Sequence, residues 1–82
     1  MKIYLLYDDE NDKNTLRRII ANNDLGLISG ESNNPKENVE NIIDTKPDLV
    51  IFDISKGDLS RLDIIKDVKE KKLSIHLIVI AN

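Results

Sequence analysis

The chain has 82 residues, of which 40% are hydrophobic and 33% are charged, and its formal net charge is -3. This composition predicts one small soluble acidic domain, and the lack of cysteine excludes disulfides and thiolate metal sites. No apolar run is long enough to span a membrane and no basic stripe offers a surface to nucleic acid, so we expect a cytoplasmic protein that contacts neither.

The first half of the chain begins with a pattern of strand, helix and strand. Residues 2–7 (KIYLLY) predict a strand, and the polar residues 8–14 predict a loop. Leu16, Ile19 and Ile20 follow at helical spacing. Gly26 is placed where that helix should stop, and residues 27–30 (LISG) begin a second strand.

A second helix is predicted next. Asn33 or Asn34 can cap it, with Pro35 in its first turn. Its buried stripe consists of Val39, Ile42 and Ile43. The helix should end before Pro47, because the residue that precedes a proline is disfavoured in the helical region.

The second half repeats the alternation. Residues 48–53 predict a third strand and residues 76–81 (HLIVIA) a fourth. The helix between them has the apolar stripe Leu62, Ile65 and Val68. This order predicts one α/β domain over residues 1–82, with a parallel sheet between layers of helices.

Carboxylates follow two of the predicted strands. Asp8 and Asp9 come directly after the first strand, and Asp53 ends the third. In the strand order 2-1-3-4 these two strands are neighbours, and ligands bind at the carboxyl ends of parallel strands. Three carboxylates that converge there would repel one another, so we expect a hard divalent cation with oxygen ligands, namely Mg²⁺.

A purely structural interpretation of these acids remains open. Asp8 and Asp9 could be solvated loop residues, and Asp53 could be a strand-terminal or helix-capping acid. An aspartate within the run VIFDI is poorly placed for solvation alone, however. The combination of all three acids therefore favours a functional site.

The segments IYLLYDDE and KPDLVIFDI resemble the receiver domain of bacterial response regulators, which accept a phosphoryl group from a sensor histidine kinase in two-component signalling. The resemblance implies a flavodoxin-like fold, of which a receiver protein is a known example. It implies that Asp53 is the phosphoacceptor. Asp8 and Asp9 would hold Mg²⁺ together with Asp53, and Ser55 would offer its backbone carbonyl to the metal.

The sequence also departs from the receiver pattern. Ala81 stands where the family has a serine or threonine that binds the phosphoryl group, and Arg61 stands where it has a glycine. The family's fifth strand, with its lysine, and its last helices have no counterpart in the 82 residues. We therefore expect a partial receiver domain whose fourth strand is an open edge, and a homodimer or larger oligomer that covers this edge.

Two alternatives to a phosphoacceptor remain. A degenerate receiver-like module could signal by binding alone, without phosphorylation. A hydrolase of the haloacid dehalogenase type also uses a strand-terminal aspartate, but it expects a second aspartate where this chain has Ser55. Any enzymatic activity is thus expected to be at most Mg²⁺-dependent self-phosphorylation and autodephosphorylation.

Overall fold

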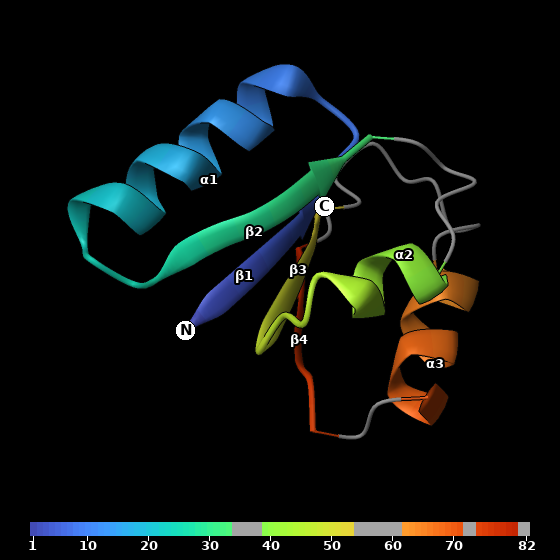
Figure 1. The fold of residues 1–82 in the computed structure, drawn as a ribbon. Coiled ribbons are helices and arrows are strands. Elements are labelled where there is room, and N and C mark those ends of the chain that lie inside the picture. The colour runs from blue at the N-terminus through green and yellow to red at the C-terminus, as the bar shows by residue number, and fades with distance from the viewer. Residues whose placement is uncertain (34–38, 54–61, 72–73, 81–82) are drawn as a thin grey trace.

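The structure is a computed structural model that describes residues 1–33, 39–53, 62–71 and 74–80. Its strands form one sheet in the order β2-β1-β3-β4, and every neighbouring pair is parallel (Figure 1). The strands are β1 (Lys2–Leu6), β2 (Leu27–Ser32), β3 (Leu49–Asp53) and β4 (His76–Ile80). The predicted α/β fold with strand order 2-1-3-4 is confirmed, and it matches the first four strands of a flavodoxin-like fold.

Helices cover both faces of the sheet. Helix α1 (Glu10–Asn22) lies on one face, whereas α2 (Val39–Asp44) and α3 (Leu62–Lys71) lie on the other (Figure 1). Side chains of a strand alternate between the two faces, so the sheet contributes to two cores. The α1-face core consists of Ile3, Leu5, Ile20 and Ile51. The α2/α3-face core consists of Tyr4, Leu6, Val39, Ile42, Val50, Phe52, Ile64, Val68 and Ile75.

Helix α1 begins earlier than the hydrophobic pattern predicted. Residues 8–14 were expected to form a loop, but the helix starts at Glu10. The reason is local: Asp9 is the N-cap, and its Oδ1 accepts a hydrogen bond from the backbone N–H of Asn11 at 2.7 Å. Glu10 and Asp12 add negative charge to the first turn, where the helix dipole favours it.

The end of α1 depends on polar side chains and a glycine. The Nδ2 atom of Asn23 donates to the carbonyl of Ile19 at 2.9 Å, which satisfies one of the last helical acceptors. Gly26 has a φ of 156°, and a Cβ at that position would meet the carbonyl oxygen of Met1. Helix α1 thus ends at Asn22, a few residues before the predicted stop at Gly26, and only glycine fits at position 26 without strain.

Two of the predicted apolar stripes are confirmed in part. Ile20 is buried as expected, but Ile19 is 47% exposed and lies outside the core. In α3, Ile64 and Val68 are buried, while Ile65 only packs against the core from its edge. Asn34, one of the two candidate caps of the second helix, and Pro35, expected in its first turn, lie outside the described residues.

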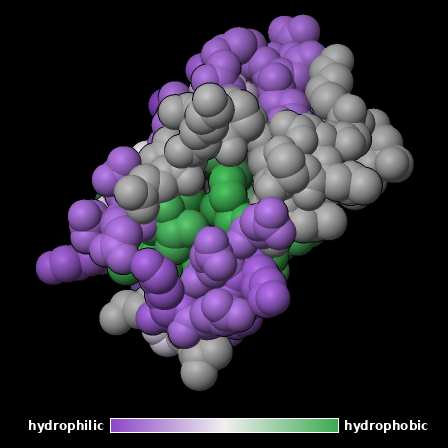
Figure 2. Space-filling model, turned by 90° about the vertical axis from the view of Figure 1, so that its right-hand side faces the viewer, coloured by the Kyte–Doolittle hydropathy of each residue, from purple (hydrophilic) through white to green (hydrophobic). Residues whose placement is uncertain are grey.

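The α2/α3 side carries a partly hydrophobic surface. Figure 2 shows hydrophobic residues at the centre of this side, bordered by hydrophilic ones. Ile43 of α2 and Ile65 of α3 are partly buried hydrophobic residues that pack against the α2/α3-face core. Lys71 at the end of α3 forms an ion pair with Glu40 of α2 at 2.7 Å, which links the two helices. Within the described ranges, no helix is long and apolar enough to cross a membrane.

Candidate functional site

The candidate site is built around Asp53, the last residue of β3. It is 4% exposed, and it is the only charged side chain that is buried among the described residues. Leu6 of β1 pairs with Phe52, so the next residue of each chain segment, Tyr7 and Asp53, lies at the same level of the sheet. Asp8 follows Tyr7 directly. The structure therefore brings Asp8 and Asp53 to the same carboxyl edge, at adjacent strands.

Alternation along β3 assigns Asp53 to one face. Leu49 and Ile51 pack with the α1-face core, and Asp53 is two residues further along the strand. Its register partner in β4 is Ile80, which packs against the same core. A carboxylate with apolar neighbours is costly to bury unless polar groups or a cation compensate it. The burial of Asp53 at this position therefore favours a carboxylate whose charge has a function.

Asp8 and Asp9, the acidic pair after β1, differ in their environment. Asp8 is half-buried, and its Oδ2 atom is shielded from solvent. Asp9 instead caps α1 through its Oδ1 atom, with the extended backbone (φ -128°) that an N-cap adopts. The backbone thus directs one oxygen of Asp9 toward the helix and not toward the sheet edge.

The expected ligand set is only partly assembled. Among the described residues, no group of three or more histidine, cysteine, aspartate or glutamate side chains is arranged so as to hold a metal ion. Ser55, which the receiver resemblance assigns to the metal, lies outside the described residues, as do Arg61 and Ala81. The structure thus supports the placement of Asp8 and Asp53 on one edge and gives Asp9 an additional role as a cap.

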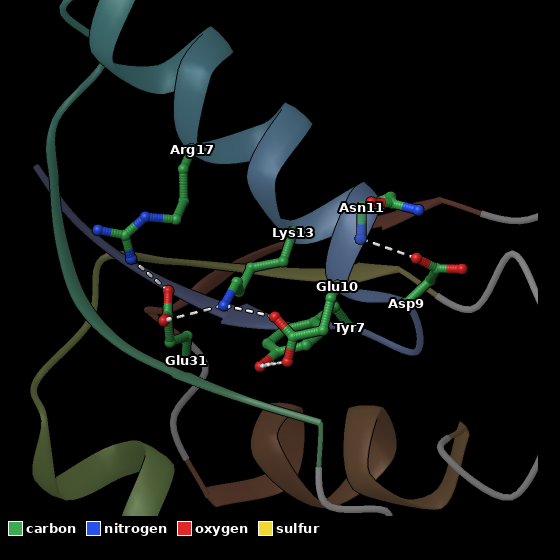
Figure 3. A network of polar contacts seen from close by, with 7 residues as sticks. All are labelled: Tyr7, Asp9, Glu10, Asn11, Lys13, Arg17 and Glu31. Atoms are coloured by element: carbon green, nitrogen blue, oxygen red, sulfur yellow. Dashed lines mark hydrogen bonds and ion pairs between the residues drawn. The ribbon is translucent and has the colours of Figure 1, made fainter.

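A polar network borders this edge on the α1 side (Figure 3). The Lys13 Nζ atom lies 2.6 Å from Glu10 Oε2 and 3.8 Å from Glu31 Oε1. Arg17 also pairs with Glu31, so the network joins α1 to β2. The Tyr7 hydroxyl donates to Glu10 Oε1 at 3.3 Å, and Lys13 Nζ lies 5.4 Å from the centre of the Tyr7 ring, within the range of a cation–π contact.

The network shifts the titration of its members. The hydrogen bond from Lys13 lowers the pKa of the Glu10 carboxyl below its ordinary value of 4.5. The same bond raises the pKa of Lys13. Burial raises the pKa of the Tyr7 phenol, and the nearby Glu10 charge raises it further. All three groups therefore keep their usual charge states near neutral pH, and the network holds the first turns of α1 against the end of β1.

This network was not found from the sequence. Glu10 and Lys13 are three residues apart, a spacing that pairs side chains on a helix, but the sequence predicted a loop there. Glu31 is distant in sequence and reaches the cations only through the parallel pairing of β1 with β2. In the sequence, the i,i+3 spacing of Glu10 and Lys13 was the only indication of this network.

Two grooves lie away from the carboxylates. The first has a volume of about 470 Å³ and is found near the start of β3; its lining residues are Ile43, Asp44, Lys46, Pro47, Asp48, Ser74 and Ile75. The second also measures about 470 Å³ and lies between α1 and β2, where it is lined by Arg17, Arg18, Ile20, Ala21, Gly26, Leu27 and Ile28. Neither groove includes Asp8, Asp9 or Asp53.

Comparison of the sequence with protein-family models and with curated proteins finds no match. The structure defines the class of the fold, which is an α/β domain with a parallel sheet of order 2-1-3-4.

Proposed function

We propose that the chain is a phosphoacceptor receiver domain of a two-component response regulator, and that Asp53 receives the phosphoryl group. The observation that carries this proposal is the buried Asp53 at the carboxyl end of β3, beside the strand that leads directly into Asp8 and Asp9. Open parallel sheets bind their ligands at this end. The parallel order β2-β1-β3-β4 supports the same assignment.

The proposed reaction uses the Asp53 carboxylate as a nucleophile. One of its oxygens attacks the phosphorus of a phosphohistidine on the kinase. The bond from phosphorus to the histidine nitrogen breaks, and that nitrogen keeps the electron pair and takes up a proton. Asp53 and the half-buried Asp8 are hard oxygen donors that fit Mg²⁺, with Asp9 and Ser55 as the further candidates. The cation would neutralise charge on the transferring oxygens.

The partner and location follow from this proposal. A sensor histidine kinase would supply the phosphoryl group, and an output function such as transcription regulation would respond to it. Exchange with such a kinase takes place in the cytoplasm, so we place the domain there. No contact with nucleic acid is assigned to this domain.

A second candidate is a receiver-like interaction module that signals without phosphorylation. The N-cap role of Asp9 favours it, because one oxygen of this carboxylate is committed to the backbone of α1. The sequence adds Ala81 at a position where the receiver family has a hydroxyl group. The two candidates differ in whether Asp53 is modified.

Labelling with a small phosphodonor tests the proposal. The protein is incubated with acetyl phosphate and Mg²⁺, trapped with borohydride, and mapped by mass spectrometry. We expect an adduct on Asp53 that is absent after metal removal by EDTA and absent in Asp53→Asn. Labelling should be slow, since loss of one preorganised donor to developing charge commonly costs about a hundredfold or more in rate and Ala81 offers no hydroxyl.

Asp48→Asn is the matched control. Asp48 lies just before β3, at the opposite end of the strand from Asp53, and its side chain accepts a hydrogen bond from the Lys2 N–H that an asparagine can keep. This variant should label like the unsubstituted protein. An adduct on another residue, unchanged labelling of Asp53→Asn, or no adduct after long incubation would refute the phosphoacceptor assignment. The last result would favour the interaction module.

A further inference from the structure

The groove between α1 and β2 combines two arginines with apolar side chains. Arg17 and Arg18 of α1 line it together with apolar residues of both elements, and none of the described residues that line it is acidic. Its volume of about 470 Å³ is within the range of ligand-binding clefts. The groove lies where α1 ends and β2 begins, at the opposite end of the strands from Asp53 (Figure 1). It is therefore separate from the candidate site at the carboxyl edge.

The two arginines of the groove differ in how they are paired. Arg17 forms an ion pair with Glu31 through its Nη1 atom (Figure 3). Arg18 is exposed and forms no ion pair with any described residue. A guanidinium has several N–H donors in a planar fork that matches a carboxylate. Arg18 is therefore the group that a carboxylate in this groove would contact first.

The rest of the groove wall is apolar and partly exposed. Ile20, Ala21, Leu27 and Ile28 contribute to it. Leu27 is 73% exposed, the highest fraction among the large hydrophobic residues described, and Leu25, in the turn between α1 and β2, is 50% exposed. A single exposed leucine is common on protein surfaces, but exposed leucines grouped beside a groove are typical of an interaction surface.

We propose that this groove binds a partner protein through a short acidic segment, in which a carboxylate and an aliphatic side chain are about two residues apart. Arg17 and Ala21 are one helical turn apart, about 6 Å along the axis of α1. Two residues of an extended peptide span this length. A carboxylate bound to Arg18 then leaves the aliphatic side chain against Ala21 and Leu27.

The overall charge of the chain does not prevent an acidic segment from binding. The formal net charge of -3 repels such a segment at long range, but salt at physiological strength screens charges beyond about 8 Å. The nearest charges therefore decide. Glu31 offsets Arg17, so that the net positive charge of the groove comes from Arg18. A basic segment would meet this charge with the wrong sign, and a nucleic-acid backbone would leave the aliphatic wall without a partner.

Binding of two terminally blocked peptides, followed by backbone amide NMR, tests the proposal. The first peptide has the sequence Glu-Glu-Ser-Leu-Leu, and the second has lysine in place of both glutamates. We expect the acidic peptide to shift the amide signals of Arg18, Ala21 and Leu27 with saturation. The lysine peptide should bind at least about tenfold more weakly, because its charges have the same sign as Arg18.

Two matched pairs of variants separate the groove from the rest of the surface. Arg18→Glu and Lys66→Glu both replace an exposed helix cation and change the net charge equally. Arg18→Glu should weaken binding of the acidic peptide at least about tenfold, and Lys66→Glu about twofold at most. Leu27→Ser should weaken binding about threefold or more, whereas Ile19→Ser, which changes an exposed aliphatic residue outside the groove, should leave it unchanged.

Several results would overturn the proposal. They are equal binding of the two peptides, an equal loss in Arg18→Glu and Lys66→Glu, and no shift of the groove amides. Octanoate that binds the groove more tightly than the acidic peptide would overturn it in favour of a small aliphatic carboxylate as the ligand. Arg18→Glu should leave the labelling of Asp53 by acetyl phosphate unchanged, so that the peptide and the phosphodonor test two separate sites.

Discussion

The two faces of the sheet are built differently, and adjacent residues of β1 show it. Leu5 and Leu6 are both fully buried, but Leu5 faces α1 and Leu6 faces α2 and α3. Among the described residues, the α2/α3-face core has nine buried residues and the α1-face core has four. The α1 face is joined to its helix partly through the polar network of Lys13 and Glu31, whereas among the described residues an ion pair of Lys71 with Glu40 links α2 to α3.

The difference bears on the proposed function. Alternation along β3 assigns Asp53 to the α1 face, so the candidate site lies beside the smaller core. Elements that change on binding are commonly drawn from the less stable parts of a protein, where few apolar contacts hold them. The larger core would then serve as the scaffold, while α1 and its first turn respond to events at the carboxyl edge.

The largest expected effect comes from leucine-to-alanine substitutions on the two faces. A domain of this size has a free energy of unfolding of about 4 to 12 kcal/mol. Leu6→Ala should cost about 3 to 5 kcal/mol, because the larger core leaves a cavity that cannot collapse. Leu5→Ala should cost about 2 to 3 kcal/mol, since α1 can shift toward the space. Urea denaturation measures both.

The pair is well matched because the two residues share type, strand and exposure. Equal m-values would show that the same surface is exposed on unfolding in each variant. If Leu5→Ala proved as costly as Leu6→Ala, the α1-face core would be as rigid as the other, and the proposed division between scaffold and responsive face would be wrong.

A smaller effect is expected from Gly30→Ala in β2. A Cβ at this position would lie 2.7 Å from Cε2 and 2.9 Å from Cδ2 of Tyr4, whose ring is buried in the α2/α3-face core. Overpacking of this kind typically costs about 1 to 3 kcal/mol. Thermal unfolding should show the loss, and the added cost should shrink in a Tyr4→Leu background. A loss that stays the same in that background would assign the cost to the backbone of β2 instead of to the ring.

The sequence was sufficient to predict the sheet, because β1, β3 and β4 are short apolar runs and the turns before β2 and β3 carry Gly26 and Pro47. The start of α1 was missed because its first turns are polar. Asp9 and the Glu10–Lys13 pair stabilise them through capping and side-chain contacts that the hydrophobic pattern does not record. Ile19 was assigned to the apolar stripe because the spacing does not distinguish it from Ile20.

The candidate site was predictable in part. The position of Asp53 at the end of β3 and of Asp8 just after β1 follows from the strand pattern and the strand order. The N-cap role of Asp9 depends on where helix α1 begins, so it could not be predicted without the first residue of that helix. The network around Lys13 required the parallel pairing of β1 with β2, which brings Glu31 to α1.

The smallest expected effects concern ion pairs on the two faces, Glu10 with Lys13 and Glu40 with Lys71. In each pair a hydrogen bond from the lysine lowers the pKa of the carboxyl below its ordinary value of 4.5. Since the folded pKa is the lower one, each glutamate stabilises the fold above about pH 4.5, and this contribution is lost as the pH falls through the folded pKa. Both glutamates are exposed, so the gain is small and decreases with salt.

Carboxyl NMR titration of Lys13→Met and of Lys71→Met tests the two ion pairs one at a time. Lys13→Met should return the pKa of Glu10 toward 4.5 and leave Glu40 unchanged, and Lys71→Met should do the reverse. Lys13→Met should also raise the pKa of Tyr7 further, because the nearby lysine charge partly offsets the effects of burial and Glu10. A phenol titration that does not differ between the two variants would mean that Lys13 does not lie against Tyr7. The first turns of α1 would then not be held to β1 through this network, and the contrast between the two faces would rest on their cores alone.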